Sequence, residues 1–239
     1  IACAGGTVNF VGEELGESDQ NRIFITGQAD GMIGPWAFIN GTNLAMYSSA
    51  LGVYKGSGAE IGVAALGGTA DSVIPNNESA SAVINMAGLQ DWITLESVWT
   101  NRILEVRQEW ADTSTVVRVV EGVTNRTLQT SRLMIGAGKA SLSIGENDNE
   151  GAVMALSPGG TLTLENQTPS AVLAVKSGIA NNGGTASGLS KFGLGPVVLT
   201  GSNSYSGATL ISEGMLEFGG DLSQRLPGAI SGAGTLVKS

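Results

Sequence analysis

Histidine is absent from this chain of 239 residues, and cysteine occurs once, at Cys3. Without histidine, the chain cannot use Ser-His-Asp or Cys-His catalysis, histidine-ligated zinc or iron, or an imidazole switch near neutral pH. A single cysteine cannot form an intrachain disulfide, so the fold must be stable through its core and its backbone hydrogen bonds. These two shortages exclude many enzyme classes before any motif is considered.

Charged and aromatic residues are also scarce, at 14% and 5% of the chain, and proline occurs 6 times. Acidic residues outnumber basic ones by 21 to 12, which gives a net charge of −9. A nucleic-acid-binding protein normally presents a basic face, and an anionic membrane repels an acidic chain. We therefore expect neither nucleic acid nor an anionic membrane surface as a partner. The sequence also lacks an apolar run of about 18 residues, the length that a transmembrane helix needs.

Glycine is abundant, with 36 residues, and the hydrophobic content of 42% argues against disorder. Short apolar or alternating runs with many β-branched residues recur along the chain, separated by glycine and asparagine pairs typical of turns. Trp99–Val106 fits a helical turn or a strand. The clearest strand-like runs are Thr7–Phe10, Arg22–Thr26, Trp36–Ile39, Ile61–Leu66, Ala82–Met86, Trp92–Leu95, Val116–Val120, Leu133–Ile135, Ala152–Leu156, Thr161–Leu164, Ala171–Val175, Val197–Thr200, Thr209–Ser212 and Met215–Phe218. The sequence predicts an all-β fold.

Two all-β architectures accommodate many short strands: a sandwich or barrel, and a solenoid. A sandwich core usually contains several large aromatic residues, whereas a solenoid stacks valine, isoleucine, leucine and alanine in columns and needs glycine or asparagine at its corners. The low charge, few aromatics and many small residues of this chain favour the solenoid. We expect it to become regular from about residue 130.

The first residues, Ile1–Val8, have neither the basic region nor the apolar region of a signal peptide, and the last ones, Gly234–Ser239, stop within a strand pattern. We therefore expect the chain to be a piece of a longer protein. The final strand, Thr235–Lys238, is expected to stack on the turn that contains Met215–Phe218. Leu236 and part of Leu216 would then lie near an open end, where copies could associate end to end.

From residue 188 the sequence resembles the autotransporter-associated β-strand repeat of bacterial surface proteins, whose pattern spaces glycine, leucine, asparagine and tyrosine at alternate positions. A second copy opens at Ile230–Lys238, and the stretch Gly31–Ala45 more loosely resembles a segment found upstream of such repeats. The chain departs from the pattern at Pro196, which should lie at an edge or corner because it has no N–H to donate. The matching positions are Leu189, Lys191, Gly193, Gly195, Leu199, Gly201, Asn203, Tyr205, Gly207, Thr209, Ile211, Gly214 and Leu216.

The resemblance implies a right-handed parallel β-helix, exported as an autotransporter passenger to the cell surface or outer membrane, or secreted. It divides the chain into an irregular solenoid part, residues 1–187, and the repeats, residues 188–239. Within the repeat, Asn203 would be a stacking amide and Tyr205 a cap against the next turn.

The acidic stretch Glu146–Gly151 resembles the start of a calcium-binding loop, with Glu146, Asp148 and Glu150 as candidate metal ligands. Ser157 stands where an EF-hand requires its bidentate glutamate. The alternative is a solvated acidic turn, and a calcium ion, if bound, would make a corner of the solenoid rigid.

Asp112-Thr113-Ser114 resembles the catalytic tripeptide of aspartic peptidases, which makes Asp112 the candidate catalytic residue. That chemistry requires two carboxylates that share a proton, but only one such tripeptide is present, and the nearest relative begins at Asp71. A homodimer could supply the second carboxylate. The alternative, which we favour, is that the Asp112 carboxylate accepts backbone or hydroxyl hydrogen bonds at the start of the next strand.

Glycan-cleaving β-helices cluster their acids, whereas the aspartates of this chain are scattered, with Asp148 between two asparagines as the nearest cluster. Tryptophans exposed in a row would stack on sugar rings, but their strand contexts predict buried packing. The tryptophans are Trp36, Trp92, Trp99 and Trp110. Two hypotheses remain: an adhesive passenger that binds a host glycan or glycoprotein, and a surface hydrolase that acts as a peptidase or on mucin-type glycans.

Overall fold

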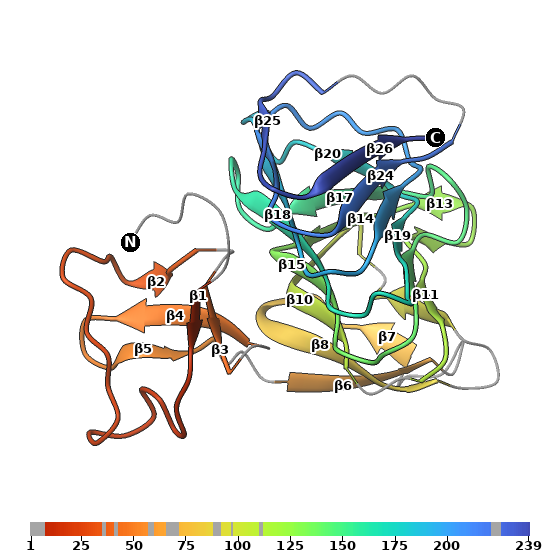
Figure 1. Ribbon diagram of the computed structural model, residues 1–239. Coiled ribbons are helices and arrows are strands. Elements are labelled where there is room, and N and C mark those ends of the chain that lie inside the picture. The colour runs from red at the N-terminus through yellow and green to blue at the C-terminus, as the bar shows by residue number, and fades with distance from the viewer. Residues whose placement is uncertain are drawn as a thin grey trace. The chain divides into compact units, whose positions relative to one another are not determined.

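The computed structural model describes residues 8–34, 37–40, 43–56, 60–65, 72–87, 92–96, 98–109, 112–220 and 226–239. The chain forms two compact units, Ile1–Ser57 and Gly58–Ser239, both built from strands (Figure 1). In the part of the chain that is described, no helix has the length and apolar character needed to cross a membrane. Cys3 lies outside the described residues.

The first unit is a small sheet of mixed direction. β4 pairs antiparallel with β2, β3 and β5, while β1 pairs parallel with β3. Its core includes Leu15, Ile39, Tyr47 and Val53. Its strands are β1 (Val8–Phe10), β2 (Gly31–Met32), β3 (Ala37–Ile39), β4 (Asn43–Ser48) and β5 (Gly52–Lys55).

The second unit is a β-solenoid with three faces, in which each turn of the chain adds one parallel strand to a face. The first face contains β6 (Glu60–Ala65), β8 (Asn77–Ala87), β10 (Thr100–Gln108), β15 (Arg132–Ile135), β18 (Thr161–Asn166), β21 (Gly188–Phe192), β23 (Thr209–Ile211) and β25 (Ile230–Ser231). The second face contains β7 (Val73–Ile74), β9 (Trp92–Leu95), β11 (Thr115–Val117), β16 (Leu142–Ile144), β19 (Leu173–Val175), β22 (Val197–Leu199), β24 (Met215–Phe218) and β26 (Thr235–Lys238). The third face contains β14 (Thr127–Thr130), β17 (Ala152–Ala155) and β20 (Gly178–Ala180), which continue from the first residues of β10.

Columns of aliphatic side chains fill the solenoid. On the second face, Val117, Ile144, Val175 and Leu199 occupy the same register position on successive strands, and each is fully buried. Burying a side chain of this kind stabilises the fold by about 1.5–3 kcal/mol relative to leaving it in water. Because each strand also completes the hydrogen bonds of its neighbours, stability accumulates turn by turn.

One short antiparallel hairpin interrupts this regular winding. It consists of β12 (Val120–Glu121) and β13 (Thr124–Asn125), joined by a turn in which Gly122 has a φ of +60°. The hairpin lies between β11 on the second face and β14 on the third. We call this edge of the solenoid, formed by residues 98–99, 118–126 and 145–151, the hairpin corner.

The predicted parallel β-solenoid is confirmed for the second unit, and its parallel strands begin at β6, well before residue 130. The stretch Trp99–Val106, which fitted helix or strand, lies largely in strand β10. Residues up to Ser57 differ from the expectation of one continuous solenoid, because antiparallel pairs give them a separate core. The division at 187/188 stays a prediction about the repeat pattern, and solenoid pairing runs through it from β18 to β21.

Candidate functional site

Asp112 lies at the corner between the first and second faces, where its side chain is 83% exposed. Its Oδ1 accepts a hydrogen bond from Nζ of Lys139 at 3.1 Å. Lys139 therefore takes the place of the backbone or hydroxyl donor that the sequence predicted. Ser114 and Thr168 line the same open hollow, and Asp112 is the only acid among its described lining residues. Asp71 lies outside the described residues, so no second carboxylate of the predicted peptidase pair is placed beside Asp112.

The three candidate calcium ligands lie in one loop, but each has a protein partner. Glu146 Oε2 accepts hydrogen bonds from Nε of Arg118, at 2.7 Å, and from its Nη2. Asp148 Oδ1 bonds to the hydroxyl of Thr200. Among the described residues, histidine, cysteine and acidic side chains form no group of three that could hold a metal ion. Calcium binding by this loop stays a prediction.

Glu150 differs from the other two acids because it is buried, with 7% of its surface exposed. Its Oε1 accepts from the backbone N–H of Val119 at 2.8 Å, and its Oε2 accepts from the N–H groups of Glu146 and Asn147 at 3.1 and 3.3 Å. Backbone donors thus surround this carboxylate and compensate the cost of its burial. The arrangement fastens the acidic loop to the base of the hairpin.

The hairpin corner gathers exposed apolar and aromatic side chains that the sequence did not single out as a site. Val123, at the hairpin turn, is fully exposed, and Trp99 is 73% exposed. The guanidinium carbon of Arg126 lies 4.9 Å from the centre of the Trp99 ring. The prediction that the tryptophans are buried is therefore wrong for Trp99. Trp36 and Trp110 lie outside the described residues.

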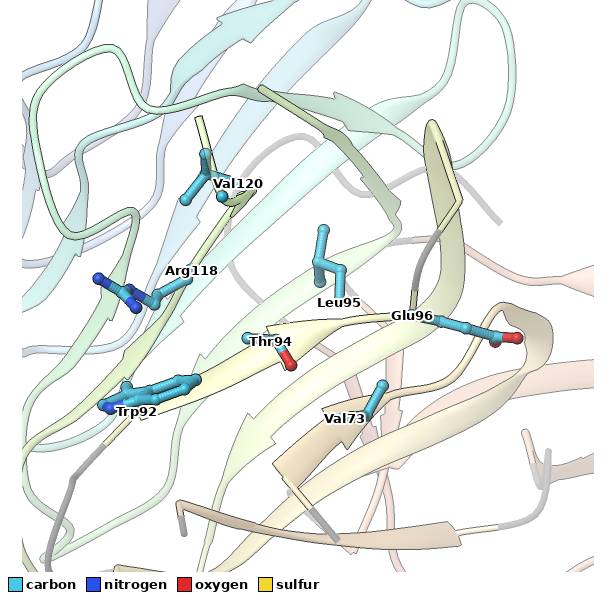
Figure 2. A pocket seen from close by; sticks show the side chains of 8 residues that line it. Val73, Trp92, Thr94, Leu95, Glu96, Arg118 and Val120 are labelled. Carbon is cyan, nitrogen blue, oxygen red and sulfur yellow. The ribbon is translucent and has the colours of Figure 1, made fainter. Parts of the chain in front are cut away.

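A second tryptophan stacks with arginine beside the hairpin. The guanidinium carbon of Arg118 lies 4.9 Å from the centre of the half-buried Trp92 ring. Both side chains line a hollow with a volume of about 430 Å³ (Figure 2). The sequence signal was the alternation of outward polar and inward apolar residues along Trp92–Leu95, which marks Trp92 as outward. The position of Arg118 beside it required the register of β9 and β11.

A ladder of charged side chains runs across the first face and was not predicted. Arg132 lies between Glu105 and Glu165 on the neighbouring strands, with N···O distances of 3.5 and 3.2 Å. Arg107 pairs with Glu105, Glu109 and Glu60. Burial by itself lowers the pKa of Arg107, but these carboxylates raise it above its ordinary value. We interpret the ladder as structural, since opposite charges alternate from turn to turn and offset the cost of burying one another.

The structure shows what glycine, asparagine, tyrosine and proline do in the repeat-like segment. Gly214 has a φ of +67°, and a Cβ there would lie 2.5 Å from the backbone carbonyl oxygen of Gly193, one turn below. Asn203 connects turns, because its Oδ1 accepts from the N–H of Ile179 at 3.0 Å, while stacking of its amide stays a prediction. Tyr205 lies within the core, where its hydroxyl bonds to that of Thr209 at 2.9 Å. Pro196 lies immediately before strand β22, as its missing N–H requires.

Residues 189–218, which form β21 to β24, match the family described as passenger-associated-transport-repeat. This segment is an autotransporter passenger-type repeat. The repeat's lysine, Lys191, is completely buried, and its ammonium group donates to the backbone carbonyls of Phe192, Gly193 and Glu213. Burial lowers the pKa of Lys191 to about 8, against the opposing charges of Glu213 and Glu165. The lysine therefore holds a corner of the passenger-associated-transport-repeat together.

Over 68 residues the chain is 43% identical to the adhesin BmaC autotransporter of Brucella suis biovar 1 (strain 1330). The match covers 28% of this chain and 2% of that protein, so the chain spans a small fraction of this relative's length. No solved structure matches the chain.

Proposed function

We propose that this chain is part of the adhesive passenger of an exported bacterial surface protein, and that it binds a host glycan or glycoprotein at the hairpin corner. The passenger would be displayed at the cell surface, remain at the outer membrane or be released by secretion. The proposal includes no cofactor.

Two comparisons support the adhesive role. Passenger-type repeats occupy residues 189–218, and the similar Brucella protein is named an adhesin. A solenoid with stacked columns is also a suitable support for adhesion, because it presents side chains on a rigid and extended surface.

The observation that carries the proposed location is the departure from regular winding at the hairpin corner. In repeat proteins, insertions tend to gather on one face, which is often the binding face. Here the hairpin and the acidic loop project from the same edge, held together by Glu150 and Val119. This edge also exposes Trp99 and Val123. Exposed aromatic side chains of this kind are enriched at binding sites.

Binding to immobilised mucin-type glycoprotein tests the proposal. We expect Trp99→Ser to weaken binding by about tenfold, since losing a tryptophan contact at the centre of an interface commonly costs about 1–2 kcal/mol, and Val123→Ser to weaken binding by less. The matched control is Leu194→Ser, because Leu194 is 65% exposed at another corner. Absence of binding to a panel of glycoproteins and glycans, or equal loss in the control, would contradict the proposal.

The same preparation tests the hydrolase alternative. We expect no turnover of mucin-type glycoprotein or casein at acid or neutral pH, and no difference between the wild-type chain and Asp112→Ala. The reason is that the Asp112 carboxylate is exposed, pairs with Lys139 and has no second carboxylate beside it in the described part of the chain. Turnover that disappears in Asp112→Ala would instead replace the adhesive proposal with a peptidase.

A further inference from the structure

The hollow beside the hairpin has the form of a shallow trough on the second face. Trp92 and Thr94 point outward from β9 while Ile93 and Leu95 point inward, and Glu96 continues the outward row. Figure 2 shows Trp92 and Arg118 together at one end of the trough and Glu96 at the other, with Thr94 between them. Four residues of extended strand span about 13 Å. The volume of about 430 Å³ is in the range of small-molecule sites.

Neighbouring groups hold the polar ends of this trough in place. Arg118 stacks on Trp92 and donates to Glu146 through Nε and Nη2, which leaves Nη1 without a protein partner among the described residues. Glu96 is held through Oε2, which accepts from the backbone N–H of Asn76 at 2.5 Å. The trough therefore has a fixed donor near one end and a fixed acceptor at the other. Such preorganisation reduces the entropy lost when a ligand binds.

The charges around the trough disfavour an anionic ligand. Glu146 neutralises Arg118, and Glu96 adds a further negative charge, in a chain whose net charge is −9. Like-charge contacts at a binding surface are costly. Apolar C–H groups of a ligand find partners in the indole of Trp92 and in the side chains of Val73 and Val120.

We propose that this trough binds an uncharged hexopyranose segment of a glycan. The sugar ring packs its C–H groups on the valines and on the part of the Trp92 indole that Arg118 leaves uncovered, Nη1 of Arg118 donates to a ring hydroxyl, and the Glu96 carboxylate accepts from another. An uncharged polyhydroxylated ring matches both the apolar floor and the donor–acceptor pair, whereas a uronate or sialate would place its carboxylate against Glu96 and Glu146. This assignment deepens the proposed function and rests on it for its biological meaning, but the trough is testable by itself.

Saturation-transfer NMR with the whole chain tests the assignment, using methyl glycosides of galactose, mannose and N-acetylgalactosamine as neutral probes. Methyl glucuronide and methyl sialoside are the anionic probes. We expect transfer to at least one neutral glycoside and none to the anionic ones. Glu96→Gln should weaken binding of the neutral glycoside about tenfold, because a charged carboxylate is a stronger hydrogen-bond acceptor than a neutral amide. Trp92→Phe, which keeps an aromatic ring, should also weaken it.

Glu217→Gln is the matched control, since Glu217 is on β24 of the same face, several turns away. It should leave binding unchanged within about twofold. Equal transfer to anionic and neutral glycosides, no transfer to any glycoside, or an unchanged Glu96→Gln affinity would overturn the assignment. If glycoprotein binding persists in Glu96→Gln while the free glycosides show no transfer, the trough assignment fails and the adhesive function stands. If neutral glycosides bind in the trough but no glycoprotein binds, the adhesive function fails and the trough assignment stands.

Discussion

The carboxylate of Glu150 accepts a hydrogen bond from the backbone N–H of Val119, 31 residues earlier and one turn away, at an O···N distance of 2.8 Å. This contact joins the acidic loop to the base of the hairpin. It also shows why the last of the three predicted calcium ligands is turned toward the protein.

Glu150→Gln should lower the free energy of unfolding by about 1–3 kcal/mol, because an amide NH₂ replaces one carboxylate oxygen and faces N–H donors that lose their acceptor. Urea unfolding monitored by circular dichroism measures the change. Glu146→Gln is the control, since Glu146 is 47% exposed and its pair with Arg118 should contribute at most about 1 kcal/mol. Equal destabilisation by the two substitutions would contradict the role assigned to Glu150.

Calcium titration should give no saturable heat at about 1 mM ion, the concentration at which extracellular calcium modules bind. An ion would have to displace Arg118 from Glu146 and Thr200 from Asp148. Isothermal calorimetry on the whole chain makes the measurement. Saturable binding that is lost in Asp148→Asn would establish the calcium site and refute the acidic-turn interpretation.

Arg132→Met should destabilise the solenoid by about 3–5 kcal/mol, because it leaves the buried carboxylates of Glu105 and Glu165 without their shared cation. Arg102→Met removes a pair with Glu78 whose side chains are 45% and 54% exposed, and should cost at most about 1 kcal/mol. Denaturant midpoints of the two variants decide the matter. If the two losses are equal, the ladder does not stabilise the first face as inferred.

Lys191 should make stability rise with pH between about 8 and 10.5. Below its folded pKa of about 8, the amine is protonated in both states, so the cost of burying the charge is fully present. Between the folded pKa and the ordinary value of 10.5, the unfolded chain binds more protons than the folded one, and the free energy of unfolding increases.

Comparison with Lys191→Met isolates this effect, since other groups that titrate in the same range are common to both proteins. The wild-type chain should gain stability relative to Lys191→Met as the pH is raised from 7.5 to 10. A constant difference between the two unfolding free energies across this range would show that the amine titrates normally.

The last strand should exchange its amide hydrogens quickly. β26 stacks on β24 as predicted, with Leu236 beside Leu216. Leu236 is 43% exposed, but Leu216 is fully buried, so the expectation that part of Leu216 lies at the open end is wrong. We expect fast hydrogen exchange for residues 230–239 and slow exchange for Leu199–Ile211. At high concentration, end-to-end association of copies should slow exchange in the tail and raise the sedimentation coefficient. A tail already protected in dilute monomer would contradict this expectation.

Much of the solenoid could be predicted from the sequence because its rules are local. Alternating residues such as Val116 and Val117 predict which side chains point inward, and glycines such as Gly193 and Gly214 are required where the backbone has positive φ and another turn passes close by. The spaced residues of 189–218 predicted the passenger-type repeat in the same way. Features that depend on neighbouring residues of a single turn, such as side-chain direction and the position of glycines, can therefore be predicted from the sequence.

Only the tertiary structure decided which side chains from different turns meet. Arg118 and Glu146 are 28 residues apart, which is one turn of the solenoid, whereas Asp148 and Thr200 are 52 apart, which is two turns, because the acidic loop extends along the edge past its neighbouring turn. The same reason hid the stacking of Arg118 on Trp92 and the exposure of Trp99, which depend on the register between strands and on the excursion of the hairpin. A sequence of local strand and turn signals determines that the chain winds into a solenoid. The stacking of its turns determines which side chains the loops bring together at one edge, and therefore where the proposed binding surface lies.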